Sequence, residues 1–343
     1  MKQAASSRAQ RGLTLLELMV AMLLGLLLTG AALSVVLTVS RTNAATESLS
    51  RIQEGARLAF DLLARDVREA GGNACSRGLP VANVLNNSAT AWWGNWNDPV
   101  RGYDDTTAIS GLAFGSGAGQ RVSGTDAIEL KSGLATGYSV EEHKPTSANF
   151  KINTSKHSFV DGDIVMVCDY RQAALLQLTN VNASNRTLVH NTGTGTPGNC
   201  SKGLGFKEPM DCSTNGTAYT YGPNSQIARV RAVRWYVGNN GRGGRSLFQA
   251  ALRNSSGTPS IDQEEVIEGV TNLQIEYLVR DAASYVSATA VAADAWQDVV
   301  AVRMTLTLAG AQGDDAGRQR VGTDGNALTR QLSHVVFIRS RSS

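Results

Sequence analysis

Histidine and proline are scarce in this chain, which holds four histidines and seven prolines among its 343 residues. The histidines lie far apart, and neither a Cys-x-x-Cys pair nor a Walker A loop occurs, so the spacings typical of zinc ligands and phosphate-binding loops are missing. Residues 193–198 fit a Gly-x-Gly-x-x-Gly pattern, but Pro197 interrupts it and no helical pattern follows, which favours a surface loop. Two pairs of acids invite comparison with calcium ligands, although turns and loops are the simpler interpretation: Asp104 with Asp105, and Asp161 with Asp163. The sequence therefore gives no case for an enzyme, a metal site or a cofactor.

Outside residues 1–12, basic and acidic side chains are equal in number, so the rest of the chain carries no net positive charge. The formal net charge is +3, and Lys2, Arg8 and Arg11, with no acid among residues 1–12, account for all of it. Charge therefore gives no argument for nucleic-acid binding by the rest of the protein. Charged residues make up 18% of the chain while glycine reaches 35 residues, a composition more typical of an exported β-rich domain than of a helical cytosolic enzyme.

Cysteine is also rare, with four widely spaced residues: Cys75, Cys168, Cys200 and Cys212. An even number in an exported domain favours two disulfides, whereas a cytosolic protein would keep four free thiols. Three pairings are possible. The simplest joins Cys200 to Cys212 across a short loop and leaves Cys75 for Cys168.

Charge and proline are absent from Leu18 to Ser40. As a helix, these 23 residues extend over about 34 Å, enough to cross the hydrocarbon core of a bilayer. The preceding flank is basic, so the positive-inside rule places residues 1–12 in the cytoplasm and the chain beyond Arg41 outside it.

One acid, Glu17, stands at the start of this apolar run, where a carboxylate is costly unless it lies at the interface or serves a function. The local sequence Arg11-Gly12-Leu13-Thr14-Leu15-Leu16-Glu17-Leu18 resembles the processing site of type IV prepilins and type II secretion pseudopilins. The resemblance implies that a prepilin peptidase cuts after Gly12 and methylates the new N-terminus at Leu13. It also implies that Glu17 pairs with the N-terminal amine of a neighbouring subunit and sets the register of a filament.

Two other interpretations of this segment fit less well. A secretory signal peptide has a shorter apolar core followed by a small-residue cleavage site, which is not evident here. A plain signal anchor would not require Gly12 and Glu17 at this spacing.

The pattern after Arg41 predicts that the helix continues to about Ala70 and stops at Gly71-Gly72. Apolar residues recur in steps of three and four, on one helical face: Leu49, Ile52, Ala56, Ala59, Phe60, Leu63 and Val67. Charged residues, Asp66 among them, fill much of the rest. The expected division is a leader at 1–12, a transmembrane half-helix at 13–40, an amphipathic half at 41–72 and a head at 73–343.

Strand patterns outnumber helical ones after Gly72. Alternating or apolar runs bounded by Asn- and Gly-rich turns predict strands in these ranges: 126–131, 158–160, 164–168, 175–181, 187–190, 226–237, 273–279, 299–308 and 332–338. The expected fold class is α+β, with a long N-terminal transmembrane and amphipathic helix packed against an antiparallel β-rich head.

An aromatic cluster, Trp92, Trp93 and Trp96, stands in a segment rich in Gly, Asn and Ser. If exposed, these rings would suit a partner, a glycan or DNA. Aromatic clusters more often cover the edge of a core, and packing is the favoured interpretation.

Several further segments resemble the large minor pilin PilW of type IV pilus assembly. They include residues 52–57, 62–71, 266–270 with 273–277, Trp296 with 300–304, and 335–339. The resemblance implies a minor pilin that primes a type IV pilus. Its expected partners are prepilin peptidase, other minor pilins, the major pilin, the inner-membrane assembly platform and lipid, and its expected location is the inner membrane with a periplasmic head.

Two alternatives stay open from the sequence: a J-type pseudopilin of type II secretion, and a pilus-associated adhesin or DNA-binding subunit.

Overall fold

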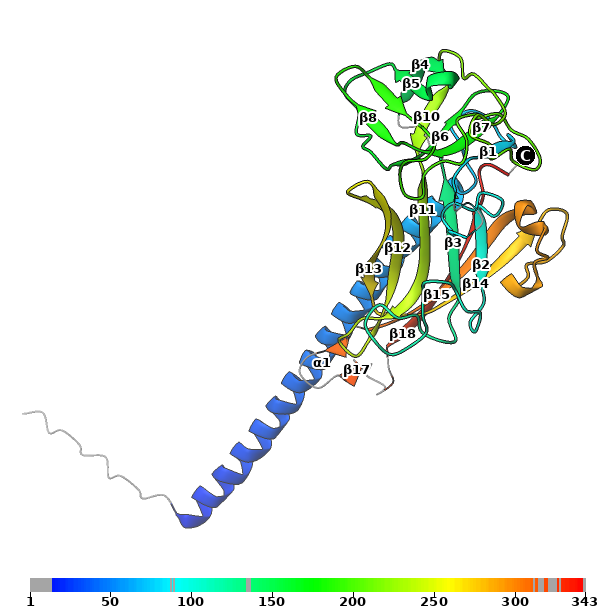
Figure 1. Ribbon diagram of the computed structural model, residues 1–343. Coiled ribbons are helices and arrows are strands. Elements are labelled where there is room, and N and C mark those ends of the chain that lie inside the picture. Colours follow the sequence, from blue (N-terminus) through cyan, green and yellow to red (C-terminus); the bar gives the residue numbers. More distant parts are fainter. Residues whose placement is uncertain are drawn as a thin grey trace, which may run out of the picture.

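The computed structural model describes residues 14–86, 88, 90–133, 137–310, 312–313, 318–319, 326 and 328–341. Within them, one long helix, α1 (Leu15–Glu69), runs into a head built mostly of antiparallel strands, as Figure 1 shows. The α+β prediction is confirmed. Gly71, just past the helix, has a φ of 67°, a left-handed conformation that glycine adopts without steric cost and that turns the chain out of the helix.

The helix divides into an exposed half and a half that packs on the head. Every residue from Thr14 to Asn43 is exposed, and the first buried residue is Ser48. Beyond it, five residues of the predicted apolar face are buried, and two, Leu49 and Phe60, are half-buried; the buried five are Ile52, Ala56, Ala59, Leu63 and Val67. Ala64, which was not predicted, is also buried. Asp66 is buried as well, so the prediction that it belongs to the polar face was wrong.

Two antiparallel sheets enclose the packed half of the helix. The five-stranded sheet has the order β13 (Thr258–Glu268), β12 (Arg245–Ser255), β11 (Arg231–Asn239), β3 (Ala127–Ser132), β2 (Val100–Tyr103). The three-stranded sheet has the order β14 (Val270–Val279), β15 (Val299–Ala309), β18 (Thr329–Phe337). The helix contacts β3 and β13 of the first sheet and β15 and β18 of the second, and all share one hydrophobic core.

A third sheet lies farther from the start of the helix (Figure 1). We call it the distal sheet. Its order is β1 (Val81–Asn83), β7 (Ala173–Gln177), β6 (Ile164–Cys168), β10 (Gln226–Arg229), β4 (Tyr138–Lys144), β5 (Asn149–Ile152), β9 (Thr187–Val189), β8 (Asn180–Asn182). It has its own hydrophobic core, which includes Phe150, Val165 and Leu176.

Short elements complete the described chain. The strands β16 (Gln312–Gly313) and β17 (Arg318–Gln319) pair with each other. Three 3-10 helices occupy connecting segments: η1 (Pro145–Ser147), η2 (Ala288–Ala290) and η3 (Ala295–Asp298).

The longest predicted strand, 226–237, is two strands that belong to different sheets. Residues up to Arg229 pair with β6 in the distal sheet, and residues from Arg231 pair with β3 and β12. Val230 lies at the crossing, where its N–H donates to Ile164 O at 2.9 Å. The prediction of a strand at 158–160 was wrong, since these residues form no strand.

Candidate assembly site

The start of α1 is closed by a capping box. Thr14 is the N-cap, and its hydroxyl accepts a hydrogen bond from the Glu17 N–H at 3.2 Å. The Glu17 carboxylate in turn accepts from the Thr14 N–H at 3.4 Å. This pair satisfies two N–H groups that have no partner within a helix, and it places a negative charge where the helix dipole is positive. The capping box therefore orients the Glu17 side chain by contacts within a single chain.

The segment after Glu17 presents apolar side chains on all sides. This part of α1 is long and strongly apolar, and none of its residues up to Asn43 is buried. Many of its large apolar side chains are exposed, among them Leu26 and Leu28. A helix that is hydrophobic all round must find lipid or protein to cover it. Length and composition thus suit a membrane span.

Four hydroxyl groups in and just after this span are satisfied within the helix itself. Thr29 donates to Gly25 O at 2.9 Å, and Ser34 donates to Ala31 O at 2.7 Å. Thr38 and Thr42 repeat the pattern one turn back along the helix. Because each hydroxyl donates to a backbone carbonyl, none of these four exposes an unmet donor to an apolar surrounding. Glu17 is then the one strongly polar group between Leu15 and Ser40.

At the other end, Asp66 fastens the helix to the five-stranded sheet. Its carboxylate accepts from Arg231 at 2.9 and 3.1 Å and from the Trp235 ring N–H at 2.8 Å. The Gln249 amide donates to the same oxygen as Trp235, at 3.3 Å. The Asp66 side chain is 3% exposed, so these donors replace nearly all of its hydration. Sequence reasoning missed this site because its partners lie more than 160 positions away.

Residues near the C-terminal end of the described chain also donate hydrogen bonds to the end of α1. The Arg339 N–H donates to Arg68 O at 3.0 Å, and the Ser340 hydroxyl donates to Ala70 O at 2.8 Å. The Gly71 N–H donates to Lys131 O on β3 at 2.8 Å. The last carbonyls of the helix therefore have partners, and the helix direction is fixed relative to both enclosing sheets.

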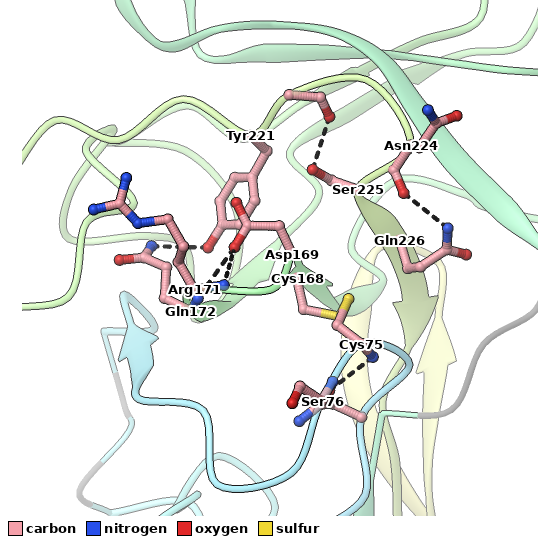
Figure 2. The surroundings of a disulfide bond; sticks show 12 residues. Cys75, Ser76, Cys168, Asp169, Arg171, Gln172, Tyr221, Asn224, Ser225 and Gln226 are labelled. Carbon is pink, nitrogen blue, oxygen red and sulfur yellow. Dashed lines mark hydrogen bonds between the residues drawn. A yellow bond between two sulfur atoms is a disulfide. The ribbon is translucent and has the colours of Figure 1, made fainter.

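A disulfide, Cys75–Cys168, joins the segment that follows the helix to the end of β6, as Figure 2 shows. The two cysteines are 93 positions apart. Asn73 orders the first side, since its amide oxygen accepts from the Cys75 N–H at 2.8 Å. On the second side, the Asp169 carboxylate accepts from the Arg171 and Gln172 N–H groups. The bond ties β6 of the distal sheet to the segment that leaves the end of α1.

The second disulfide, Cys200–Cys212, closes a loop of the distal sheet with a separation of 12 positions. Both bonds are those of the simplest pairing expected from the sequence. No described cysteine is free.

The tryptophan cluster packs on the head. Trp93 is 8% exposed, which leaves it little surface for a partner and counts against its role as a contact residue. Trp92 is half-buried, and the Arg234 guanidinium lies 4.2 Å from the centre of its ring. Arg234 pairs with the buried Glu129 at 2.7 Å, so Trp92 covers a buried ion pair. Trp96 is half-buried and lines a cleft of about 710 Å³.

The acids considered above as calcium ligands instead form ion pairs and hydrogen bonds that connect loops. Asp163 pairs with Arg229 and accepts from Asn254 at 2.8 Å, while Asp161 accepts from the Val181 N–H at 2.6 Å. Asp104 accepts from the backbone N–H groups at the start of η2. Across the described residues, no group of three His, Cys, Asp or Glu side chains is arranged to hold a metal.

Two histidines lie buried against each other in the distal sheet. The Nε2 atoms of His143 and His190 are 3.3 Å apart, and His143 Nδ1 accepts from the Tyr221 N–H at 3.1 Å. Burial lowers the pKa of His143 to about 4 and that of His190 to about 3. Both rings are therefore neutral at pH 7.

We expect this pair to make the distal sheet sensitive to acid. The unfolded chain takes up protons below about pH 6.5, whereas the folded rings resist protonation until about pH 4, so stability falls as the pH drops through this window. The expected loss between pH 7 and pH 4.5 is at least about 2 kcal/mol from these two groups. Urea unfolding of the detergent-solubilised chain at both pH values measures it. The variant H143Q/H190Q should lose less, and an equal loss in both proteins would contradict the assignment.

A long apolar helix with a capped glutamate at its start, followed by a disulfide-bonded antiparallel head, defines a type IV pilin-like protein. Comparisons with protein families agree with this class. Residues 7–33 match the prokaryotic N-terminal methylation motif. Residues 234–333 match the family of the type IV pilus-assembly protein W, PilW, and this match spans β12 to β15 and much of the neighbouring strands. Together they support a PilW-like type IV pilin. No curated protein matches the chain at a significant level.

Proposed function

We propose that this chain is a minor pilin that takes part in initiating a type IV pilus. Prepilin peptidase cuts after Gly12 and methylates Leu13, and the mature subunit joins other minor pilins in a priming complex. The observation that carries the proposal is the helix of which every residue from Thr14 to Asn43 is exposed, with Glu17 as its one strong charge before Arg41. A structural role of this kind needs no catalytic residue.

The division of the chain follows from this role. The leader, residues 1–12, remains in the cytoplasm, and residues 13–40 span the inner membrane. Residues 41–72 form the amphipathic half of the helix, and residues 73–343 form a periplasmic head. The Asp66 site supports this arrangement, because it joins the proposed membrane helix to β11 of the five-stranded sheet. Most of β11 and all of β12 lie within the residues that match the PilW family.

In this proposal, Glu17 pairs with the N-terminal amine of a neighbouring subunit. In a membrane, an amine and a carboxylate each lose hydration, and pairing offsets that cost only at one axial position. The capping box keeps Glu17 oriented at the helix start until the amine arrives. Lipid, the major pilin and the assembly platform of the inner membrane are the other expected contacts.

Deletion in the host organism tests the role. Without this chain, surface pili should be largely lost, because the complex that starts the filament lacks one of its subunits. Complementation with the full chain should restore them. Normal piliation in the deletion strain, or a defect confined to protein secretion, would contradict the proposal.

A further inference from the structure

Exposed edge strands invite pairing with other chains, and most edges in this head are protected. The distal sheet ends in β1 and β8, each three residues long, and the five-stranded sheet ends on one side in β2, four residues long. Its other edge, β13, is long but carries Pro259 and four acids: Asp262, Glu264, Glu265 and Glu268. Shortness and charge therefore protect four of the six edges in these sheets.

The outer edge of β14 is hydrogen-bonded to other segments of the head. Leu273 O accepts from the Asp126 N–H at 2.8 Å, and the Asp126 carboxylate accepts from the Ile275 N–H at 2.7 Å. Farther along, Tyr277 and Val286 exchange two backbone hydrogen bonds of 2.8 and 2.9 Å. Outward backbone groups of Leu273, Ile275 and Tyr277 on β14 thus already have partners within the head.

The strand β18 lacks most of these protections, since its one charged residue, Arg330, stands near its start. It is nine residues long and contains no proline, lysine or acid. Its pairing with β15 continues to Ile338, whose N–H donates to Val300 O at 2.9 Å. Because antiparallel bonds alternate, the even-numbered residues bond to β15, and the backbone groups of Gln331, Ser333, Val335 and Phe337 face away from it. Among the residues that the structure describes, no strand pairs with this side of β18.

Apolar side chains accompany this open edge. Val335 is 41% exposed and Phe337 is 58% exposed, on the same face of the strand, and Leu332 is 40% exposed. Three of the few large apolar side chains that the described head leaves exposed therefore lie on one strand. An added strand would gain both backbone hydrogen bonds and burial of these side chains.

The direction of β18 limits what can add to it. The His334 ring lies 5.5 Å from that of Phe60, and the Arg339 N–H bonds to Arg68 O, so strand and helix run alongside each other in the same direction. An antiparallel pair of two β18 strands would therefore point the two membrane helices in opposite directions. Subunits that share one membrane orientation cannot pair in that way.

We propose that the open edge of β18 receives a strand from a different pilin-like subunit of the same filament. This inference rests on the proposed function. When that subunit's helix lies beside the exposed part of α1, its head comes alongside β18, so the two contacts form one continuous interface. The edge then selects a neighbour by backbone pairing, with Val335 and Phe337 as its apolar contacts.

A proline at a residue that faces outward tests the edge without breaking the β15 ladder. Ser333→Pro removes an outward N–H and blocks an added strand, while Ser333→Ala keeps the N–H and loses the same contact with Thr305. We expect S333P to reach normal membrane levels with both disulfides formed, yet to lower pilus number at least about tenfold, and S333A to behave as wild type. Normal piliation with S333P would overturn the proposal.

Cross-linking identifies the occupant. With p-benzoylphenylalanine in place of Val335, irradiation of piliated cells should link this chain to a different protein with a processed, methylated N-terminus. The same probe in place of Ile261, exposed on the acidic edge β13, should give no such product. A product with a second copy of this chain, with a protein lacking a prepilin helix, or no product would overturn the assignment. If the wild-type chain is also dispensable for pili, the proposed function fails as well; if it is required, the edge alone fails.

Discussion

Replacing Glu17 with alanine should leave the chain processed and in the membrane but exclude it from the priming complex. The variant removes the one strong charge in the span, so the amine of a neighbouring subunit stays unpaired in an apolar surrounding. A cost of about 3 kcal/mol corresponds to a loss of recovery in the complex of about a hundredfold. Co-purification with other minor pilins from detergent extracts measures it.

Glu17 also serves in the capping box, and a second variant separates its two roles. Glutamine keeps an acceptor for the Thr14 N–H and so preserves the cap, but it carries no charge. We expect E17Q to fail in assembly nearly as severely as E17A. Thr14→Ala, which removes the hydroxyl that caps the helix, should have a milder effect. If E17Q assembled normally, the charge would have no role, and capping alone would explain the residue.

Replacing Asp66 with alanine should cause a large loss of stability, although the residue is an acid on a helix. It leaves the Arg231 guanidinium and the buried Trp235 N–H without their shared acceptor. The expected loss is about 2–3 kcal/mol in the free energy of unfolding, mainly because the buried Trp235 N–H loses its acceptor while the partly exposed Arg231 can still meet water. Chemical denaturation of the detergent-solubilised full chain, followed by tryptophan fluorescence, measures the change.

Asp61 provides the matched control, because it lies on the same helix and is exposed. Asp61→Ala should change stability by less than about 0.5 kcal/mol, as surface substitutions usually do. Similar losses in D61A and D66A would contradict the anchoring role of Asp66.

The N-terminal part of the protein could be predicted from sequence because its determinants are local. The uncharged run after Glu17 and the spacing from Gly12 to Glu17 lie within one short stretch of sequence. Residues 1–13 lie outside the described residues, so the cut after Gly12 and the methylation of Leu13 stay predictions. The amphipathic half was likewise predictable from its period, and its end at Gly71 from the residue itself. Local signals of this kind need no knowledge of distant partners.

The Asp66 site could not be predicted because a helical wheel places an acid on a polar face by default. What makes its burial tolerable is Arg231, Trp235 and Gln249, supplied by two strands far along the chain. The crossing at Val230 was missed for a similar reason. Alternation continues through residues 226–237, so the sequence carries no mark where pairing passes from one sheet to the other.

The strand β13 was missed because much of its surface is polar, and β12 was missed although its Leu247, Phe248, Ala250 and Ala251 are buried. Residues 258–265 of β13 are mostly exposed and acidic or polar, so no apolar alternation marks them, and the hairpin forms through pairing with β11. Conversely, the exposed edge of β18 emerges only from the fold, since the pattern at residues 332–338 predicts a strand but not which side of it stays unpaired.

Intact-mass and peptide mass spectrometry of the chain extracted from its native membrane tests the central claim most directly. The account predicts a protein that lacks residues 1–12 and carries one added methyl group on the amine of Leu13. A chain that retains its original N-terminus, or one cut beyond the apolar span, would contradict it.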